Sequence, residues 1–299
     1  MSGLAEPTIA IVLTGMLVGM AAALLGSFLV LRGNSMLADA ISHSILFGIA
    51  GAWLLTGQTS GPVQIAGAAL SGVLAVYLIE TLTRTRRLRD DAAIGLVFPA
   101  LFSAGVVLIN VFARDVHLDE HTVLLGEIGF VWLDTLTLGG IEVPRAMLAM
   151  AVMLALDAAF VLGFYKALKL ATFDADLARA LGLAPGLIFY AHLSLLSGTA
   201  VAAFDAVGVV LFITFVVVPP ATAYLLTRRL SAMIVLAMIL AAASAPLGYA
   251  LAVWLDVSIG GAMALATGPF LAGAYAWRQW RALRQRRMHH AQPAGSPSA

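Results

Sequence analysis

The chain has 299 residues, of which 61% are hydrophobic and 11% are charged, and its formal net charge is +1. A soluble domain carries about 25% charged residues, so this composition excludes a soluble globular protein and predicts a chain that lies almost entirely in a membrane. The sequence contains no cysteine, which excludes a disulfide framework and a thiolate metal site.

Nine apolar segments are long enough to cross a bilayer, which takes about 20 residues. The first has no basic n-region, so we expect a retained helix and not a signal peptide. The stretch 187–227 has no polar loop and fits either two spans or one span with a half-helix, so eight spans is the alternative. The sequence therefore predicts an all-α, polytopic membrane protein. The predicted spans are 8–31, 35–56, 62–82, 92–113, 144–168, 187–203, 205–227, 231–255 and 259–277.

Lysine and arginine are unevenly distributed between the two sides of these spans. With the C-terminus in the cytoplasm, all of the 17 basic residues except Arg114 and Arg145 lie on the cytoplasmic side. The positive-inside rule therefore favours this orientation, and nine spans place the N-terminus outside. We expect a multi-pass protein of the inner or plasma membrane.

Asp39 and His43 lie four residues apart within the second predicted span. Residues at this spacing share one face of a helix. A charged aspartate at the centre of a membrane helix costs roughly 2.5–3.5 kcal/mol on insertion scales, and intramembrane ionisable residues are functional by default. On a straight helix from Arg32, Asp39 lies about 10 Å and His43 about 16 Å along the axis, and the latter is near the middle of a ~30 Å hydrocarbon layer.

Carboxylate and imidazole groups are ligands for divalent ions such as Zn²⁺, Mn²⁺ and Fe²⁺. One pair holds a metal weakly, but a homodimer with its axis along the pore would bring two copies of Asp39 and two of His43 together. The pair therefore indicates a pathway for a divalent metal ion. The alternative is that both side chains hydrogen-bond to neighbouring helices and only fix their packing.

Four other ionisable residues are predicted at membrane depth or near its edge. Asp205 fits either a second metal ligand or a position at the outer interface between two short helices. For Asp157, pairing with a neighbouring polar group is favoured over transport, and His192 fits a structural role. Glu80 is predicted to pair with the basic run at 84–89.

The predicted outer loop, 114–143, is acidic and contains His117 and His121 within the sequence HLDEH. These histidines can capture a metal ion at the outer mouth of a pathway. A solvated acidic loop that contacts a partner protein is an equally good interpretation.

The predicted inner loop, 170–186, contains a candidate short helix. Asp174 is a suitable N-cap, and Gly182 and Pro185 end the helix. An amphipathic helix between two spans is a natural contact for a cytoplasmic partner.

Catalytic motifs are absent from the sequence. It has no HExxH, as in an intramembrane zinc protease, and no G-x-x-x-x-G-K-[ST] phosphate loop. We therefore expect a chain that is not an enzyme and that cannot hydrolyse ATP alone.

Four sequence blocks, in this order, resemble the membrane permease subunit of the zinc/manganese/iron class of ABC importers, and the similarity runs from about residue 10 to 280. The resemblance implies the type II importer permease fold, with a second permease subunit (a homodimer), cytoplasmic ATPases and an extracytoplasmic metal-binding protein. The blocks are GSFLVLRGNSMLADAISHSILFGIA, DDAAIGLVFPALFSAGVVLI, FYKALKLATFDADLARALGL and DAVGVVLFITFVVVPPATAYLLTRRL.

Functional residues of this family map onto two stretches of the chain. The D-x-x-S-H pore ligands match Asp39 and His43, with Ser42 between them. The stretch ATFDADLARALGL matches the coupling helix, at about 173–183, that sits in a groove of the ATPase. The residues expected to make that contact are Phe173, Asp174, Leu177, Ala178 and Leu181.

The predicted function is the permease of an ATP-driven importer for a divalent transition metal, with a transmembrane domain at 1–283 and a disordered cytoplasmic tail at 284–299. The HLDEH-type loop resembles the manganese/iron/zinc branch, so manganese is placed first, with zinc and iron close behind. We expect membrane lipid as a partner, no nucleic acid and no cofactor beyond the transported metal. The alternatives are an autonomous, gradient-driven carrier or channel and a structural scaffold.

Overall fold

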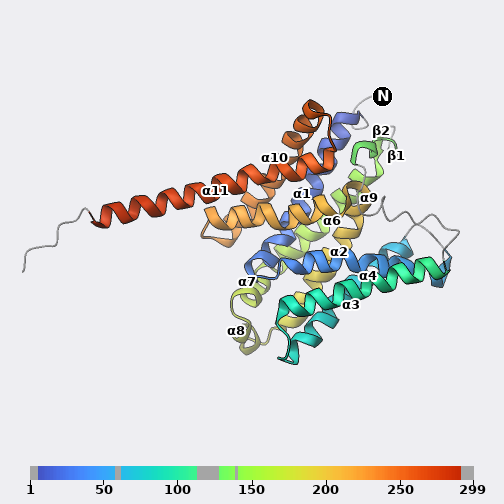
Figure 1. Ribbon diagram of the computed structural model, residues 1–299, viewed down its shortest axis with the longest axis horizontal. Coiled ribbons are helices and arrows are strands. Elements are labelled where there is room, and N and C mark those ends of the chain that lie inside the picture. Colours follow the sequence, from blue (N-terminus) through green and yellow to red (C-terminus); the bar gives the residue numbers. More distant parts are fainter. Residues whose placement is uncertain (1–5, 58–61, 113–127, 139–140, 291–299) are drawn as a thin grey trace, which may run out of the picture.

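The computed structural model of the protein describes residues 6–57, 62–112, 128–138 and 141–290, which form a bundle of long helices (Figure 1). These helices follow the long apolar segments of the sequence, because only a helix satisfies every backbone polar group inside a lipid bilayer. The elements are α1 (Pro7–Leu31), α2 (Met36–Thr56), α3 (Pro62–Arg84), α4 (Asp90–Phe112), η1 (Ile128–Phe130), β1 (Thr135–Leu138), β2 (Ile141–Pro144), α6 (Arg145–Gly163), α7 (Tyr165–Phe173), α8 (Ala175–Ala180), α9 (Pro185–Leu226), α10 (Leu230–Leu255) and α11 (Ile259–His290).

Within the described residues, nine helical segments are long and apolar enough to cross a membrane, as predicted. Their bounds agree with the predicted spans to within a few residues. Two of the nine are the halves of α9, which is interrupted at Gly208, where φ is +75° and ψ is 171°. Glycine adopts this left-handed conformation without a steric penalty. The halves of α9 point in different directions (Figure 1), so the apolar stretch 187–227 forms two spans.

Helix α1 lies at the centre of the larger group of helices, between α6, α9 and α10 (Figure 1). Its sequence is apolar on every side, which is typical of a helix surrounded by protein. Small residues allow close approach here: a methyl group added at Gly26 would overlap the backbone of Val216 in α9. In a membrane the hydrophobic effect does not drive helices together, so the close contacts that small residues allow stabilise helix packing.

Helices α2, α3 and α4 form a second group, in which α2 packs against both of the others. At Gly48 in α2 and Gly67 in α3, each backbone lies so close that a methyl group on either would overlap the other helix. The hydroxyl of Ser71 in α3 also donates a hydrogen bond to the carbonyl oxygen of Ser44, at 2.8 Å. These contacts fix α2, the helix that carries Asp39 and His43, against α3.

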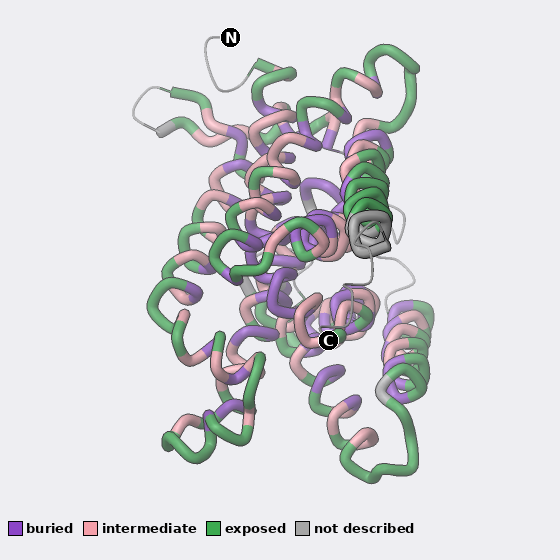
Figure 2. The backbone as a smooth tube through the Cα atoms, turned by 90° about the vertical axis from the view of Figure 1, so that its left-hand side faces the viewer, coloured by how far each residue is buried: buried purple, intermediate pink, exposed green. Residues whose placement is uncertain are grey.

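Figure 2 views the molecule from the end at which α8 and α11 project. Buried residues line the helix faces that meet one another, and exposed residues follow the outer faces and the connecting turns. Many exposed side chains are large and apolar, including Leu156, Leu162 and Val253. This pattern is expected for helices whose outer faces contact lipid.

One feature was not predicted from the sequence: strands β1 and β2 form a two-stranded antiparallel hairpin before α6. Thr135 pairs with Pro144, and Leu138 pairs with Ile141. The hairpin lies in the predicted outer loop.

At the other end of the chain, α11 continues to His290, beyond residue 283, where the transmembrane domain was predicted to end.

Candidate functional site

A sharp turn at residues 32–35 separates α1 from α2 and sets the position of the acid–histidine pair. Gly33 has φ +72°, and the backbone N–H of Asn34 bonds to the carbonyl of Leu29 at 3.0 Å. The assumption of a straight helix from Arg32 is therefore wrong, because α2 begins at Met36. Asp39 lies in the first turn of α2, about 4.5 Å along its axis.

Asp39 and His43 lie on one face of α2, as their spacing predicted. The His43 Nε2 atom is 3.4 Å from the Asp39 Oδ1 atom, and the two side chains are 30% and 32% exposed. The helix N-terminus stabilises the negative charge of a carboxylate in the first turn. The pair is thus partly enclosed by the chain and partly open at its surface.

Two aromatic rings of α4 hold the imidazole of His43. Phe98 stacks on it with a centroid distance of 5.4 Å, and Phe102 meets it edge-on at 5.9 Å. Phe98 and Phe102 are one helical turn apart, so they form a single wall beside the ring. This wall leaves the ring nitrogens as the polar part of His43 that can take part in ligand binding.

Ser42, which lies between the two residues, has a different partner. Its hydroxyl donates to the carbonyl oxygen of Ala38 at 2.7 Å, and its side chain is buried. The described residues contain no group of three or more His, Cys, Asp or Glu side chains that could surround a metal. Within one described chain, Asp39 and His43 are thus an incomplete ligand set.

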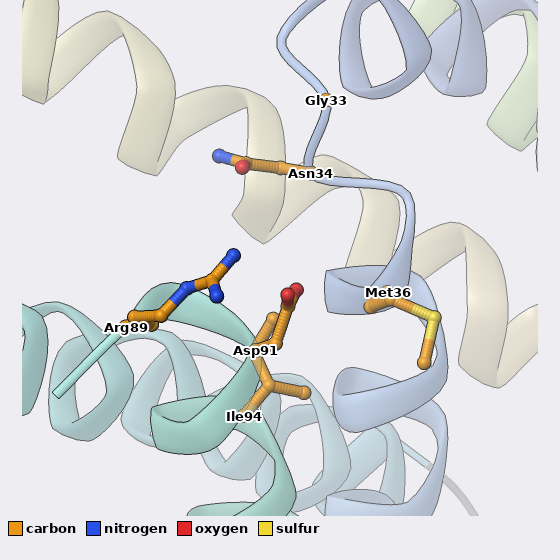
Figure 3. Close-up of a pocket in the computed structure, with 6 residues that line it drawn as sticks. All are labelled: Gly33, Asn34, Met36, Arg89, Asp91 and Ile94. Carbon is orange, nitrogen blue, oxygen red and sulfur yellow. The ribbon is translucent and has the colours of Figure 1, made fainter.

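A cavity of about 330 Å³ lies beside the N-terminal end of α2, between the α1–α2 turn and the start of α4 (Figure 3). Its lining includes Asn34, Met36 and Asp91, and Arg89 points toward it from the opposite side (Figure 3). Met36 precedes Asp39 by three residues, so both lie on the same face of α2. Neither Asp39 nor His43 lines the cavity, which lies one helical turn before Asp39 and offers carboxylate and amide oxygen atoms.

The short helix predicted in the inner loop is present as α8. The Oδ1 atom of Asp174 accepts a hydrogen bond from the backbone N–H of Leu177 at 2.9 Å, so Asp174 is the N-cap as predicted. Gly182 ends the helix with φ +79°, and Pro185 begins α9.

The residues predicted for the partner contact divide into two sets in this helix. Phe173, Leu177 and Leu181 are 61%, 46% and 65% exposed. Asp174 is also exposed. Ala178 is fully buried, so it packs inside the chain and does not form part of the exposed face. The surface at α8 therefore combines exposed apolar side chains with the exposed ion pair of Asp176 and Arg179, at 2.9 Å.

Arg32 connects this region to the start of α2. Its Nη2 atom donates to the carbonyl oxygen of Ala171 in α7 at 3.2 Å, and its guanidinium lies 4.1 Å from the ring centre of Phe189 in α9. Burial lowers the pKa of Arg32, while the nearby carboxylate of Glu80 raises it. Three residues separate Arg32 from Met36, so Arg32 connects α7 to the turn that precedes α2.

A cavity of about 570 Å³ adjoins Arg32, and Glu80 and Arg179 also line it. Glu80 pairs with Arg84 at 2.6 Å, as predicted, and it accepts a hydrogen bond from the hydroxyl of Tyr190 in α9. Charged residues of α1, α3 and α8 thus meet at one end of the bundle.

The remaining predicted residues are not brought to Asp39 and His43. The Thr199 hydroxyl donates to the Asp157 carboxylate at 2.9 Å, which confirms the predicted polar partner. His192 is buried and meets Phe28 edge-on at 5.5 Å. Asp205 lies in α9 three residues before the break at Gly208, and its side chain is outside the described part. His117 and His121 also lie outside the described residues.

Sequence reasoning missed Phe98, Phe102 and Arg32 as parts of this site. The two phenylalanines do lie four apart in a predicted span, but nothing in the sequence shows which helix they face. Arg32 was assigned only to the inner membrane boundary.

The helical bundle and its acid–histidine pair define a membrane permease, and comparison with known proteins identifies the family: the chain belongs to the ABC 3 transport family, which matches residues 5–276. It is 46% identical over 266 residues to the manganese transport system membrane protein MntD of Bacillus subtilis, covering 89% of this chain and 90% of that protein. It is 44% identical over 268 residues to the zinc transport system membrane protein TroD of Treponema pallidum, covering 90% and 73%.

A third relative is the chelated iron transport system membrane protein YfeC of Yersinia pestis, 34% identical over 82% of this chain and 77% of that one. Among solved structures, PsaBC from Streptococcus pneumoniae in complex with Fab aligns with a TM-score of 0.73 and 28% identity, covering 89% of each chain. The resemblance to the metal-type ABC importer permeases is thereby confirmed. These relatives favour the importer over an autonomous carrier.

Proposed function

We propose that the chain is the permease of an ATP-driven importer for a divalent transition metal, with manganese first and zinc and iron close behind. The observation that carries the proposal is the partly exposed Asp39–His43 pair on a membrane-spanning helix. Carboxylate oxygen and imidazole nitrogen suit these metals. The names of the relatives, which mention manganese, zinc and chelated iron, support the same substrates.

The pore is formed by two copies of the chain. One copy offers one carboxylate and one imidazole, and the described residues of one chain contain no larger ligand group. Two copies related by an axis along the pore would supply two Asp39 and two His43 side chains, which is a four-ligand set. Such a site can remove part of the hydration shell of the ion and still release it.

The rings of Phe98 and Phe102 give the site a fixed geometry. A ring packed on two sides loses little further freedom when its nitrogen meets a metal, so part of the entropy cost of binding is already met in the folded chain. The adjoining cavity near Asp91 then receives the ion on the cytoplasmic side.

A partner subunit supplies the ATP hydrolysis, and α8 is its contact. The side chains of Phe173, Leu177 and Leu181 support this role, because each exposes large apolar area that a partner could cover. Asp174 holds the helix in shape as its cap. Metal is delivered by an extracytoplasmic binding protein at the outer loop that contains His117 and His121. Asp205 is a further candidate ligand.

Movement of α8 reaches the pore through Arg32. Helix α8 continues from α7, and the hydrogen bond from Arg32 to Ala171 joins α7 to the turn before α2. A shift of α7 by the ATPase would thus displace the first turn of α2, in which Asp39 lies. The C-terminus is cytoplasmic in this arrangement, in line with the distribution of Lys and Arg.

Reconstitution tests the proposed function. The permease, its ATP-hydrolysing subunit and the metal-binding protein are placed in liposomes, and uptake of radiolabelled manganese is measured, with zinc and iron as competitors. We expect uptake that requires ATP and all three components. Equal uptake by the permease alone, driven by a metal or proton gradient, would contradict the proposal.

A further inference from the structure

A third polar cavity lies at the ends of α9 and α11, and the transport mechanism makes no use of it. Its volume is about 410 Å³, and its lining includes Tyr224, Arg228, Trp277, Arg278 and Arg281. Three guanidinium groups and two amphipathic aromatic side chains therefore surround one space. The lining contains no carboxylate.

The charge of this cavity is not balanced by the chain. Residues 206–299 contain seven arginines and a single acidic residue, Asp256. Asp256 lies at the opposite end of α10 from Arg229, a distance of about 40 Å along a 26-residue helix. Among the described residues, none of the arginines that line the cavity forms an ion pair.

An aromatic ring orients Arg281 of the cavity, and a second ring orients Arg284, which follows it in α11 but does not line the cavity. Arg281 lies 4.9 Å from the ring centre of Trp277, and Arg284 lies 3.9 Å from that of Trp280. The two tryptophan rings are themselves 5.2 Å apart. A cation–π contact orients a guanidinium but leaves its positive charge in place. The guanidinium of Arg281 is therefore oriented before any ligand binds.

The cavity lies at the level where two spans end. The membrane-spanning part of α11 ends at Arg281, and the second span of α9 ends at Leu226. Tryptophan and tyrosine favour the membrane–water interface, and Tyr224 and Trp277 are both exposed. The lining also includes Leu226, an exposed apolar side chain in the last turn of α9. A ligand here meets positive charge at one end and apolar surface at the other.

This combination matches one class of ligand. We propose that the cavity between α9 and α11 binds the phosphate headgroup of an anionic phospholipid of the cytoplasmic leaflet. Guanidinium groups bind phosphate through paired N–H donors, and the acyl chains lie against the apolar side chains of the adjoining spans. The proposal rests on the same membrane orientation as the proposed function, but it does not depend on metal transport.

An alternative ligand is an acidic surface of the ATPase subunit. The position of the cavity argues against it, because the end of α11 and the exposed helix α8 lie apart in the molecule (Figure 1). Basic clusters immediately beyond a membrane span attract anionic lipid by roughly fivefold in affinity per Lys or Arg residue. Three arginines around one cavity thus strongly favour a lipid with an anionic headgroup over a lipid with a neutral one.

The test compares lipid binding to the purified, detergent-solubilised chain. Native mass spectrometry and thermal unfolding are measured with added phosphatidylglycerol, phosphatidylcholine or inorganic phosphate. We expect retained phosphatidylglycerol and a higher Tm with this lipid, and little effect of the other two. Inorganic phosphate that raises the Tm as much as the lipid would overturn the lipid assignment.

Variants locate the site. Arg228→Gln, Arg278→Gln and Arg281→Gln are each expected to weaken phosphatidylglycerol binding by about fivefold, and the triple variant is expected to lose it. The triple lysine variant keeps the charge and should retain most of the binding, which separates loss of charge from misfolding. Arg145→Gln, an exposed arginine assigned to the outer side, is the matched control. Wild-type lipid binding by the triple glutamine variant, or loss of ATPase association in its place, would overturn the proposal.

Discussion

The contact between α4 and α2 allows a quantitative prediction about the geometry around His43. Gly105 of α4 lies against the backbone of α2. A methyl group at this position would be 2.8 Å from the amide nitrogen of Phe47, whereas ordinary contact begins at 3.4 Å. The nearest atoms are backbone, which cannot rotate away. Gly105→Ala must therefore separate the two helices by about 0.6 Å at this point.

The same helix offers a matched control. A methyl group at Gly95 meets no atom within 4 Å, so Gly95→Ala changes the helix propensity of α4 in the same direction without a clash. Overpacking of a well-packed contact costs about 1–3 kcal/mol. Because the propensity gain of up to ~1 kcal/mol is common to both variants, we expect Gly105→Ala to be less stable than Gly95→Ala by about 1–3 kcal/mol.

The assay is thermal or denaturant unfolding of the two purified variants in the same detergent, followed by metal uptake at a temperature where both are folded. Phe102 precedes Gly105 by three residues, so the displaced segment includes a ring that contacts His43. We therefore expect lower uptake for Gly105→Ala only. Equal unfolding midpoints for Gly105→Ala and Gly95→Ala would refute the packing argument.

Three further predictions concern the polar contacts. Arg32→Lys keeps the charge but loses the planar group that stacks on an aromatic ring, so we expect ATP hydrolysis by the complex to continue while metal uptake per ATP falls; unchanged uptake per ATP would exclude the relay. Asp157→Asn preserves an acceptor for Thr199 and should be tolerated, whereas Asp157→Ala should cost about 1–3 kcal/mol in unfolding measurements; equal stability of the two would contradict the buried hydrogen bond. Asp174→Ala removes the cap of α8 and should cost about 1 kcal/mol and weaken co-purification of the ATPase; Asp174→Asn is the control that should retain both.

The number of spans and the candidate ligand pair were predictable from local sequence. Span positions follow from the length of the apolar segments, and the shared face of Asp39 and His43 follows from helical periodicity. The cap at Asp174 is equally local, because its partner is three residues away.

Contacts between distant segments were not predictable in this way. The rings beside His43 come from a helix more than 50 residues along the chain, and Arg32 contacts Ala171, which is 139 residues away. The depth of Asp39 and His43 in the membrane was misjudged for a related reason. Gly33 breaks the helix after Arg32, but the chain has 28 glycines, and the sequence does not show which of them adopt a positive φ. The strands β1 and β2 are only four residues each, too short for a clear alternating pattern.

The central claim is that Asp39 and His43 are the metal ligands of the pore. Asp39→Asn and His43→Gln preserve size and hydrogen bonding but remove the carboxylate and imidazole ligands, and Asp256→Asn makes the acid-to-amide change at an exposed site outside the pore. Initial rates of ATP-dependent manganese uptake are measured in liposomes with equal amounts of each reconstituted complex. The account predicts strong loss of uptake for the first two variants and a normal rate for the third. Normal uptake by Asp39→Asn and His43→Gln would contradict it.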